Sequence, residues 1–128
     1  MKVKIETITH NKQRYDTVGD YQLMPDGEWY ISVSETGNSK YDFLIAIHEL
    51  IELYLTQFNG ISEESIMDFD LYFEKKRQMG FINDTDEPGF CSESPYRKEH
   101  TIATAIEMML AAELGVDWKK YDDDINQL

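Results

Sequence analysis

Three polar side chains within an apolar segment are the residues of this sequence best suited to chemistry. Between Phe43 and Leu55, every residue except His48, Glu49 and Glu52 is Phe, Leu, Ile, Ala or Tyr. Buried carboxylates and imidazoles are costly unless they are paired, hydrogen-bonded or bound to a cation. In a helix, His48 and Glu52 share a face because they are four residues apart, and Glu49 lies one step round. The H-E-x-x-E spacing therefore predicts a divalent-metal site.

A second apolar segment, residues 102–114, carries a related pattern. At 100° per residue, His100 and Glu107 fall on one stripe of a helix. Their neighbours on that stripe include Ala103 and Ala111, and such small side chains allow another helix to approach closely. We therefore expect the two apolar helices to pack side by side in the core.

This packing would bring together a complete set of metal ligands. We expect His48, Glu52 and His100 to bind the ion, with Glu107 as a fourth ligand or as the partner of a ligand. Two nitrogens with one or two carboxylates suit Zn²⁺ or another first-row divalent ion.

Each of these residues also has a structural explanation. A single histidine on an apolar helix, such as His48, is typical of a hydrogen-bonded core residue. Glu107 can pair with Arg97, Lys98 or a tyrosine hydroxyl. Cys91 lies nine residues before His100 and is compatible with a ligand or with a free thiol.

The H-E-L-I-E run at residues 48–52 is similar to the active-site helix of zincin metallopeptidases, and a small sheet before the motif helix also resembles a minimal zincin. The resemblance implies a zinc-dependent hydrolase in which Glu49 is the general base that takes a proton from metal-bound water. The sequence departs from the family pattern where Glu52 replaces the second histidine. A salt bridge on the less buried side of the helix is the alternative role for Glu49.

Residues 95–118 resemble small proteins encoded by phages and mobile elements. This resemblance implies a phage or mobile-element protein but no established activity, so a non-enzymatic function stays open. An acidic chain of this kind can mimic DNA and occupy the basic site of a DNA-binding protein. That alternative predicts an extended array of surface carboxylates.

A magnesium-dependent, helical nucleotide hydrolase is the second alternative. In it, Glu49 and Glu52 would hold Mg²⁺ together with Asp68, Asp70 and Glu74 of a neighbouring helix. This hypothesis predicts four or more oxygen ligands and leaves both histidines outside the site.

The elements that must position these residues begin with a small sheet. Alternation over residues 2–9 and 29–34, with a less regular stretch at 20–24, predicts about three antiparallel strands within residues 1–36. In the first strand we expect one face, which includes Ile5, to be half buried. Pro25-Asp26-Gly27 provides the turn between the second and third strands.

Helices are expected over the remaining portion, residues 39–128. The main helices are predicted at 39–58, at 62–79 with Ser62 as N-cap and nearer the surface, and from Pro95 to about residue 114 with Ser94 as N-cap. A short helix should follow Asp117. The irregular, acidic loop 81–93 is expected to border the site. The fold class is thus α+β.

Composition indicates one globular domain over residues 1–128. Hydrophobic residues make up 41% and aromatic residues 12%, and a chain of this length buries about two thirds of its unfolded surface. The 25 acidic and 12 basic residues give a net charge of −13. This charge repels phosphate backbones, so we expect no direct nucleic-acid binding. It suits a basic protein or peptide partner, cation binding or solubility.

The expected location is the cytoplasm. With Cys91 as its one cysteine the chain can form no internal disulfide, which fits a reducing compartment. The N-terminus lacks the apolar core of a signal peptide. No stretch approaches the roughly 20 apolar residues of a membrane span, so we expect no membrane partner.

Overall fold

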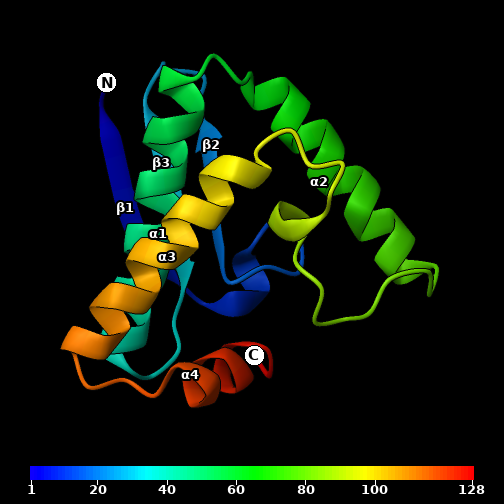
Figure 1. Cartoon of the computed structure of the whole chain (residues 1–128). Coiled ribbons are helices and arrows are strands. Elements are labelled where there is room, and N and C mark those ends of the chain that lie inside the picture. Colours follow the sequence, from blue (N-terminus) through cyan, green and yellow to red (C-terminus); the bar gives the residue numbers. More distant parts are fainter.

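A three-stranded sheet followed by four α-helices makes up the fold (Figure 1), in a computed structural model that describes residues 1–128. The α+β class is therefore confirmed. The strands are β1 (Val3–Ile8), β2 (Gly19–Leu23) and β3 (Trp29–Ser34). The helices are α1 (Ser39–Phe58), α2 (Glu63–Gln78), α3 (Arg97–Glu113) and α4 (Trp118–Ile125), and short 3-10 turns occur at η1 (His10–Lys12) and η2 (Pro88–Phe90).

The sheet is mixed, so the prediction of a purely antiparallel sheet was wrong. Its strand order is β1-β3-β2, with β2 antiparallel and β1 parallel to the central strand. The alternation of side chains is the same in both kinds of strand pair, so the sequence pattern could not distinguish them. The connection through η1 carries the chain to the far edge of the sheet, and the turn after β2 returns it beside β1.

The two faces of β1 are largely exposed, contrary to the predicted half-buried face. Ile5 is 46% exposed, as expected for an edge strand that no helix covers. The core lies instead against the central strand, where Ile31 and Val33 are buried, and the aromatic rings of Tyr21 and Trp29 extend it.

Helix α1 has the predicted bounds, but α3 starts later than predicted. The Asn38 side chain accepts hydrogen bonds from the first turn of α1, which fixes its start at Ser39. The third helix was expected to start at Pro95 but begins at Arg97. Residues 94–96 form a turn instead, in which Ser94 Oγ accepts a hydrogen bond from the Tyr96 N–H.

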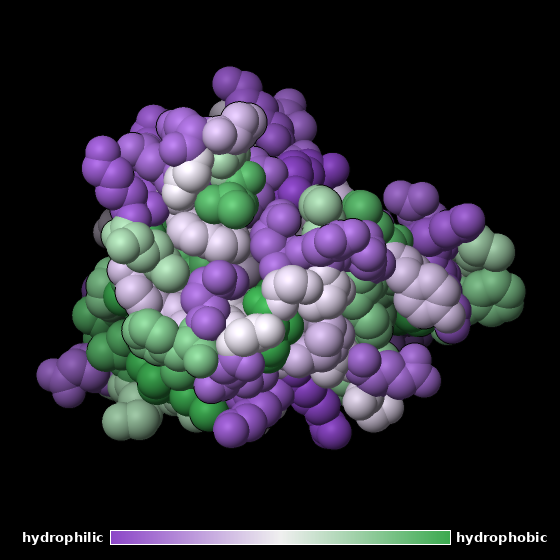
Figure 2. All heavy atoms as spheres, turned by 90° about the horizontal axis from the view of Figure 1, so that it is seen from above, coloured by the Kyte–Doolittle hydropathy of each residue, from purple (hydrophilic) through white to green (hydrophobic).

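The two apolar helices α1 and α3 pack side by side, as predicted (Figure 1). Ala103 and Ala111 are buried in this contact. Helix α1 also packs on β2 and β3. Its apolar composition suggested a helix buried on nearly every face, but Phe43 is 43% and Phe58 75% exposed. Figure 2 shows hydrophobic atoms in several patches among hydrophilic ones, with a large patch at the lower left of the view.

Helix α2 lies apart from the α1–α3 pair (Figure 1) and has the fewest buried residues of the three long helices. Only Ile66 and Phe73 of α2 are buried, in agreement with its predicted surface position. Ser62 accepts a hydrogen bond from Ser65 N–H as the predicted N-cap. None of the helices combines the length and the apolar character needed to cross a membrane.

Candidate metal centre

Three side chains from α1 and α3 converge in the core. His48 and Glu52 are one turn apart on α1, and His100 faces them from α3. His48 Nε2 lies 3.1 Å from both Glu52 Oε2 and His100 Nδ1, and the latter two atoms are 2.7 Å apart. The three residues are only 5–8% exposed. The structure thus brings together three of the four predicted ligands.

The geometry of this cluster fits one divalent ion. Tetrahedral ligands at zinc bond lengths of about 2.0–2.1 Å lie about 3.3 Å from one another. Two of the three separations, at 3.1 Å, are close to that value, and the third, at 2.7 Å, would have to lengthen when an ion binds. Two imidazole nitrogens and one carboxylate oxygen are also a ligand set found at catalytic metal sites. The buried His-Glu-His cluster could therefore hold a divalent metal ion.

Glu107 holds the opposite side of the His48 ring. His48 Nδ1 is 2.7 Å from Glu107 Oε1, and the Tyr121 hydroxyl donates to Glu107 Oε2 at 2.6 Å. A carboxylate on the outer nitrogen of an imidazole orients the ring and aims its other nitrogen at a metal. Of the two roles expected for Glu107, its position fits the partner of a ligand, because its oxygens are not among the converging atoms.

The other two converging residues have outer partners that the sequence analysis missed. Tyr21 on β2 donates its hydroxyl to Glu52 Oε1 at 2.9 Å, and Glu87 Oε2 lies 2.9 Å from His100 Nε2. Each of the three residues therefore presents one polar atom to the cluster and has the other held by a neighbour. Tyr21 belongs to a strand without clear alternation, and Glu87 is one acid among several in its loop, so neither carried a distinguishing signal.

The predicted functional loop, residues 81–93, does border the cluster. Besides Glu87, it places Phe90 edge-on to the His100 ring, with centroids 4.5 Å apart. Gly89 lies flat against that ring, and a Cβ there would come within 2.2 Å of His100 Cγ, so no side chain fits. Cys91 is a free thiol and contributes no converging atom.

Burial is the largest single effect on the pKa values of the three residues, but the hydrogen bonds and charges within the cluster together outweigh it. Burial alone would raise the pKa of Glu52, but hydrogen bonds from His100 and His48 lower it to about 2. Burial would lower the pKa of His100, but its bonds to Glu52 and Glu87 raise it to about 9. The pKa of His48 is likewise raised well above its ordinary value by Glu107 and Glu52, against the effect of burial. A bound cation would take the place of protons shared among these groups.

Glu49 lines the cavity beside the cluster and makes no hydrogen bond or ion pair within the chain. Burial, and then the charge of Glu52, raise its pKa well above the ordinary value. Strand β2 passes close by: a Cβ on Gly19 would lie 2.7 Å from Glu49 Oε1 and 2.8 Å from Ile45 Cγ2. The predicted salt bridge of Glu49 is therefore absent, and its carboxyl group is free to meet a ligand.

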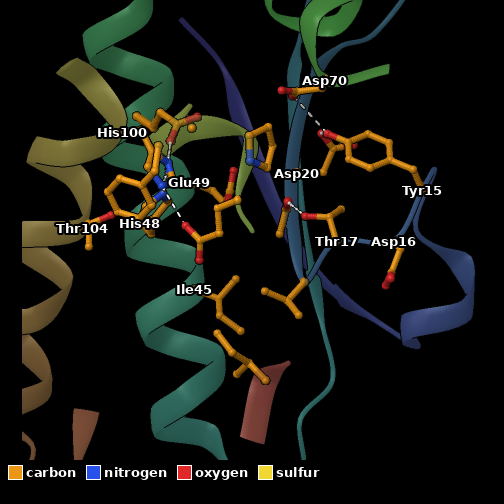
Figure 3. A pocket seen from close by; sticks show the side chains of 18 of the residues that line it. Tyr15, Asp16, Thr17, Asp20, Ile45, His48, Glu49, Asp70, His100 and Thr104 are labelled. Carbon is orange, nitrogen blue, oxygen red and sulfur yellow. Dashed lines mark hydrogen bonds and ion pairs between the residues drawn. The ribbon is translucent and has the colours of Figure 1, made fainter. Parts of the chain in front are cut away.

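A cavity of about 500 Å³ opens beside the cluster. His48 and Glu49 lie on one side of it, while Tyr15, Asp20 and Asp70 face them from the other (Figure 3). The cavity therefore gives a small molecule or a peptide segment access to the converging residues.

The contacts of the helix α2 carboxylates disfavour the magnesium hypothesis. Asp68 is exposed and does not line the cavity, and Glu74 pairs with Arg77 at 2.9 Å. Asp70 accepts hydrogen bonds from two tyrosines. The histidines, which that hypothesis places outside the site, lie at its centre.

Removing the hydroxyl that holds Glu52 should weaken metal binding. We expect Tyr21→Phe to lower the affinity for Zn²⁺ by about 10- to 100-fold, since residues that orient ligands have effects of this size. Competition with a chromophoric chelator measures the affinity. Tyr30→Phe is the matched control, because Tyr30 also donates to a glutamate, Glu6, but on the exposed sheet surface. Equal affinities of the two variants would contradict the assigned role of Tyr21.

Comparisons of the chain with models of known protein families, with curated proteins and with solved structures gave no significant match.

Proposed function

We propose that this protein is a metal-dependent hydrolase, with Zn²⁺ held by His48, Glu52 and His100, that acts on peptide or related amide bonds. The observation that carries the proposal is the asymmetry of the cluster. Each of the three residues is fixed from outside by its own partner, while the inner side borders a cavity that contains an unpaired carboxyl group, Glu49. A structural site would have four protein ligands and no need of a cavity.

The bound ion would supply Lewis acidity, which polarises a carbonyl group and makes a water molecule more acidic. The chain supplies the proton transfers. Glu49 would accept a proton from the attacking water and then deliver it to the leaving amine, and its carboxyl group is available for this role because no residue of the chain competes for it. Glu107 and Glu87 keep the imidazole rings of His48 and His100 aimed at the cluster.

The resemblance of residues 48–52 to the zincin active-site helix agrees with this assignment. In that pattern the second motif residue is the general base, and Glu49 occupies the corresponding position. The departure at Glu52 is compatible with the same ligand chemistry, because His100 from α3 provides the second imidazole. The ligand set is thus two histidines and one glutamate, with the glutamate on the motif helix.

Metal analysis of protein purified without an affinity tag tests the proposal. We expect about one Zn²⁺ per chain, and a loss of affinity of more than about 100-fold in His48→Ala and in His100→Ala, since a ligand should matter more than a residue that orients one. The control is His10→Ala, because this third histidine bonds Ser34 and Asp16, away from the cluster. Unchanged zinc content in either ligand variant would remove that residue from the site.

A further inference from the structure

The wall of the cavity opposite the cluster carries a carboxylate that has no cation. Asp70 of α2 accepts hydrogen bonds from the hydroxyls of Tyr15, at 3.2 Å, and of Tyr96. Both partners are neutral, and Asp70 makes no ion pair. A half-buried carboxylate that has only neutral partners is poorly compensated for the hydration it has lost.

The basic residues around the cavity are already paired with other acids. Arg14 binds Asp20 through two bonds, of 2.6 and 2.9 Å, and Arg77 pairs with Glu74 at 2.9 Å. Twelve acidic residues line the cavity, against these two arginines, no lysine and three histidines, of which His48 and His100 have raised pKa values. Acidic residues remain in the majority, so the cavity favours cations over anions.

Polar atoms at the other end of the cavity also lack partners. The hydroxyl of Thr104, on α3 between His100 and Glu107, is buried and makes no hydrogen bond. Buried polar groups are nearly always satisfied in folded proteins. Glu49 nearby also lacks a partner in the chain, but it is only half-buried. The unsatisfied hydroxyl at one end of the cavity and the poorly compensated carboxylate at the other indicate a ligand that spans it.

We propose that the cavity selects substrates with an organic cation, an ammonium or guanidinium group, which lies against Asp70 while the bond to be cleaved lies at the cluster. This inference rests on the proposed function, whose substrate class it names. The hydroxyls of Tyr15 and Tyr96 orient the carboxylate, and a charged N–H donor provides the strong hydrogen bond that neither tyrosine can. Burial raises the pKa of Asp70 to about 7 against the effect of the Tyr96 hydrogen bond, as expected for a carboxyl group without a cation.

Hydroxamates of single amino acids test this selectivity, because their hydroxamate group binds metal ions and their side chain can be varied. Calorimetry on the zinc-loaded protein would compare the hydroxamate of lysine acetylated at its α-amine with the norleucine counterpart, which lacks only the side-chain ammonium group. We expect the lysine probe to bind at least tenfold more tightly. N-acetyl-arginine hydroxamate and norleucine hydroxamate with a free α-amine distinguish a guanidinium and a backbone ammonium from the lysine side chain.

Asp70→Asn should abolish the preference for the cationic probe and leave binding of the N-acetyl-norleucine probe unchanged. Asp68→Asn is the matched control, since it removes the same charge from the exposed side of α2 and should keep the preference. If none of the three cationic probes binds the wild-type protein more tightly than the N-acetyl-norleucine probe, or if the preference survives Asp70→Asn, the inference is overturned while the metal site is left intact.

A failure of the metal site gives a different result. In that case no hydroxamate would bind through the metal, and the metal-free protein would be titrated with N-acetyl-lysine methylamide and its norleucine counterpart. Tighter binding of the lysine amide that Asp70→Asn removes would support the cation site without the hydrolase. Equal or undetectable binding of both amides would overturn the cation site as well.

Discussion

Replacing Glu49 with glutamine should lower the rate of zinc-dependent peptide hydrolysis by about 10²- to 10⁴-fold, the usual contribution of a general base. Glutamine has nearly the same shape but cannot accept a proton. Glu49 makes no hydrogen bond to the converging residues, so Glu49→Gln should bind zinc as the wild-type protein does. Mass spectrometry of a mixed peptide library before and after incubation measures the rate, and metal analysis checks the zinc content.

Glu113→Gln is the control for this experiment, because Glu113 is exposed on α3. Hydrolysis by Glu49→Gln at the wild-type rate would remove Glu49 from the chemistry. A wild-type protein that binds zinc in all preparations and cleaves no peptide or amide would instead identify the cluster as a structural site.

Asp70→Asn should stabilise the metal-free protein at alkaline pH. The pKa of Asp70 is about 7 in the folded protein, above the ordinary value of 3.8, chiefly because of burial. Between pH 3.8 and about pH 7, the Asp70 carboxyl group is protonated in the folded state and ionised in the unfolded state. Its contribution to the free energy of unfolding is fully present below about pH 4. This contribution is lost as the pH rises through 7, and the total loss is about 4 kcal/mol.

The difference in unfolding free energy between Asp70→Asn and the wild-type protein should therefore grow by up to about 4 kcal/mol from pH 4 to pH 8. Urea unfolding in the presence of a chelator measures it, and the difference cancels the titration of all groups that the two proteins share. Asp68→Asn should differ from the wild-type protein by an amount that changes little with pH, because its side chain is exposed. A pH-independent difference for Asp70→Asn would show that burial does not perturb this carboxyl group.

The expected cost of Asp70 also bears on its function. Selection for stability alone would replace a carboxyl group that destabilises the free protein above neutral pH. Binding groups commonly have such a cost, because a site is built for its ligand and not for the free protein. A cationic ligand that offsets the lost hydration of Asp70 would account for its position in the cavity.

Local patterns in the sequence were sufficient to predict the helices and part of the candidate metal centre. The apolar pattern predicted a helix at residues 39–58, and α1 spans Ser39–Phe58 in the structure. The same periodicity placed His48 and Glu52 on one face and His100 on a stripe with small neighbours. A polar residue in an apolar helix stands out because its burial is costly, so these residues could be found without any tertiary information.

Residues whose roles depend on long-range contacts left no comparable signal. Nothing near Tyr21 or Glu87 indicates that their side chains reach Glu52 and His100. Asp70 was grouped with Asp68 and Glu74 by spacing, and only its contacts with two tyrosines distinguish it. The parallel pairing of β1 was also missed, because alternation specifies which side chains share a face and not which strand lies alongside.

The sequence by itself determined which segments are helical, the α+β class and the identity of the three converging residues, because helix periodicity and the cost of burying charge act over a few neighbouring residues. The tertiary structure alone decided that these residues meet, that Glu107 holds His48 from outside, and that Glu49 and Asp70 face one cavity. Those relations arise where segments distant in the chain pack together, and packing depends on the shape of the whole fold.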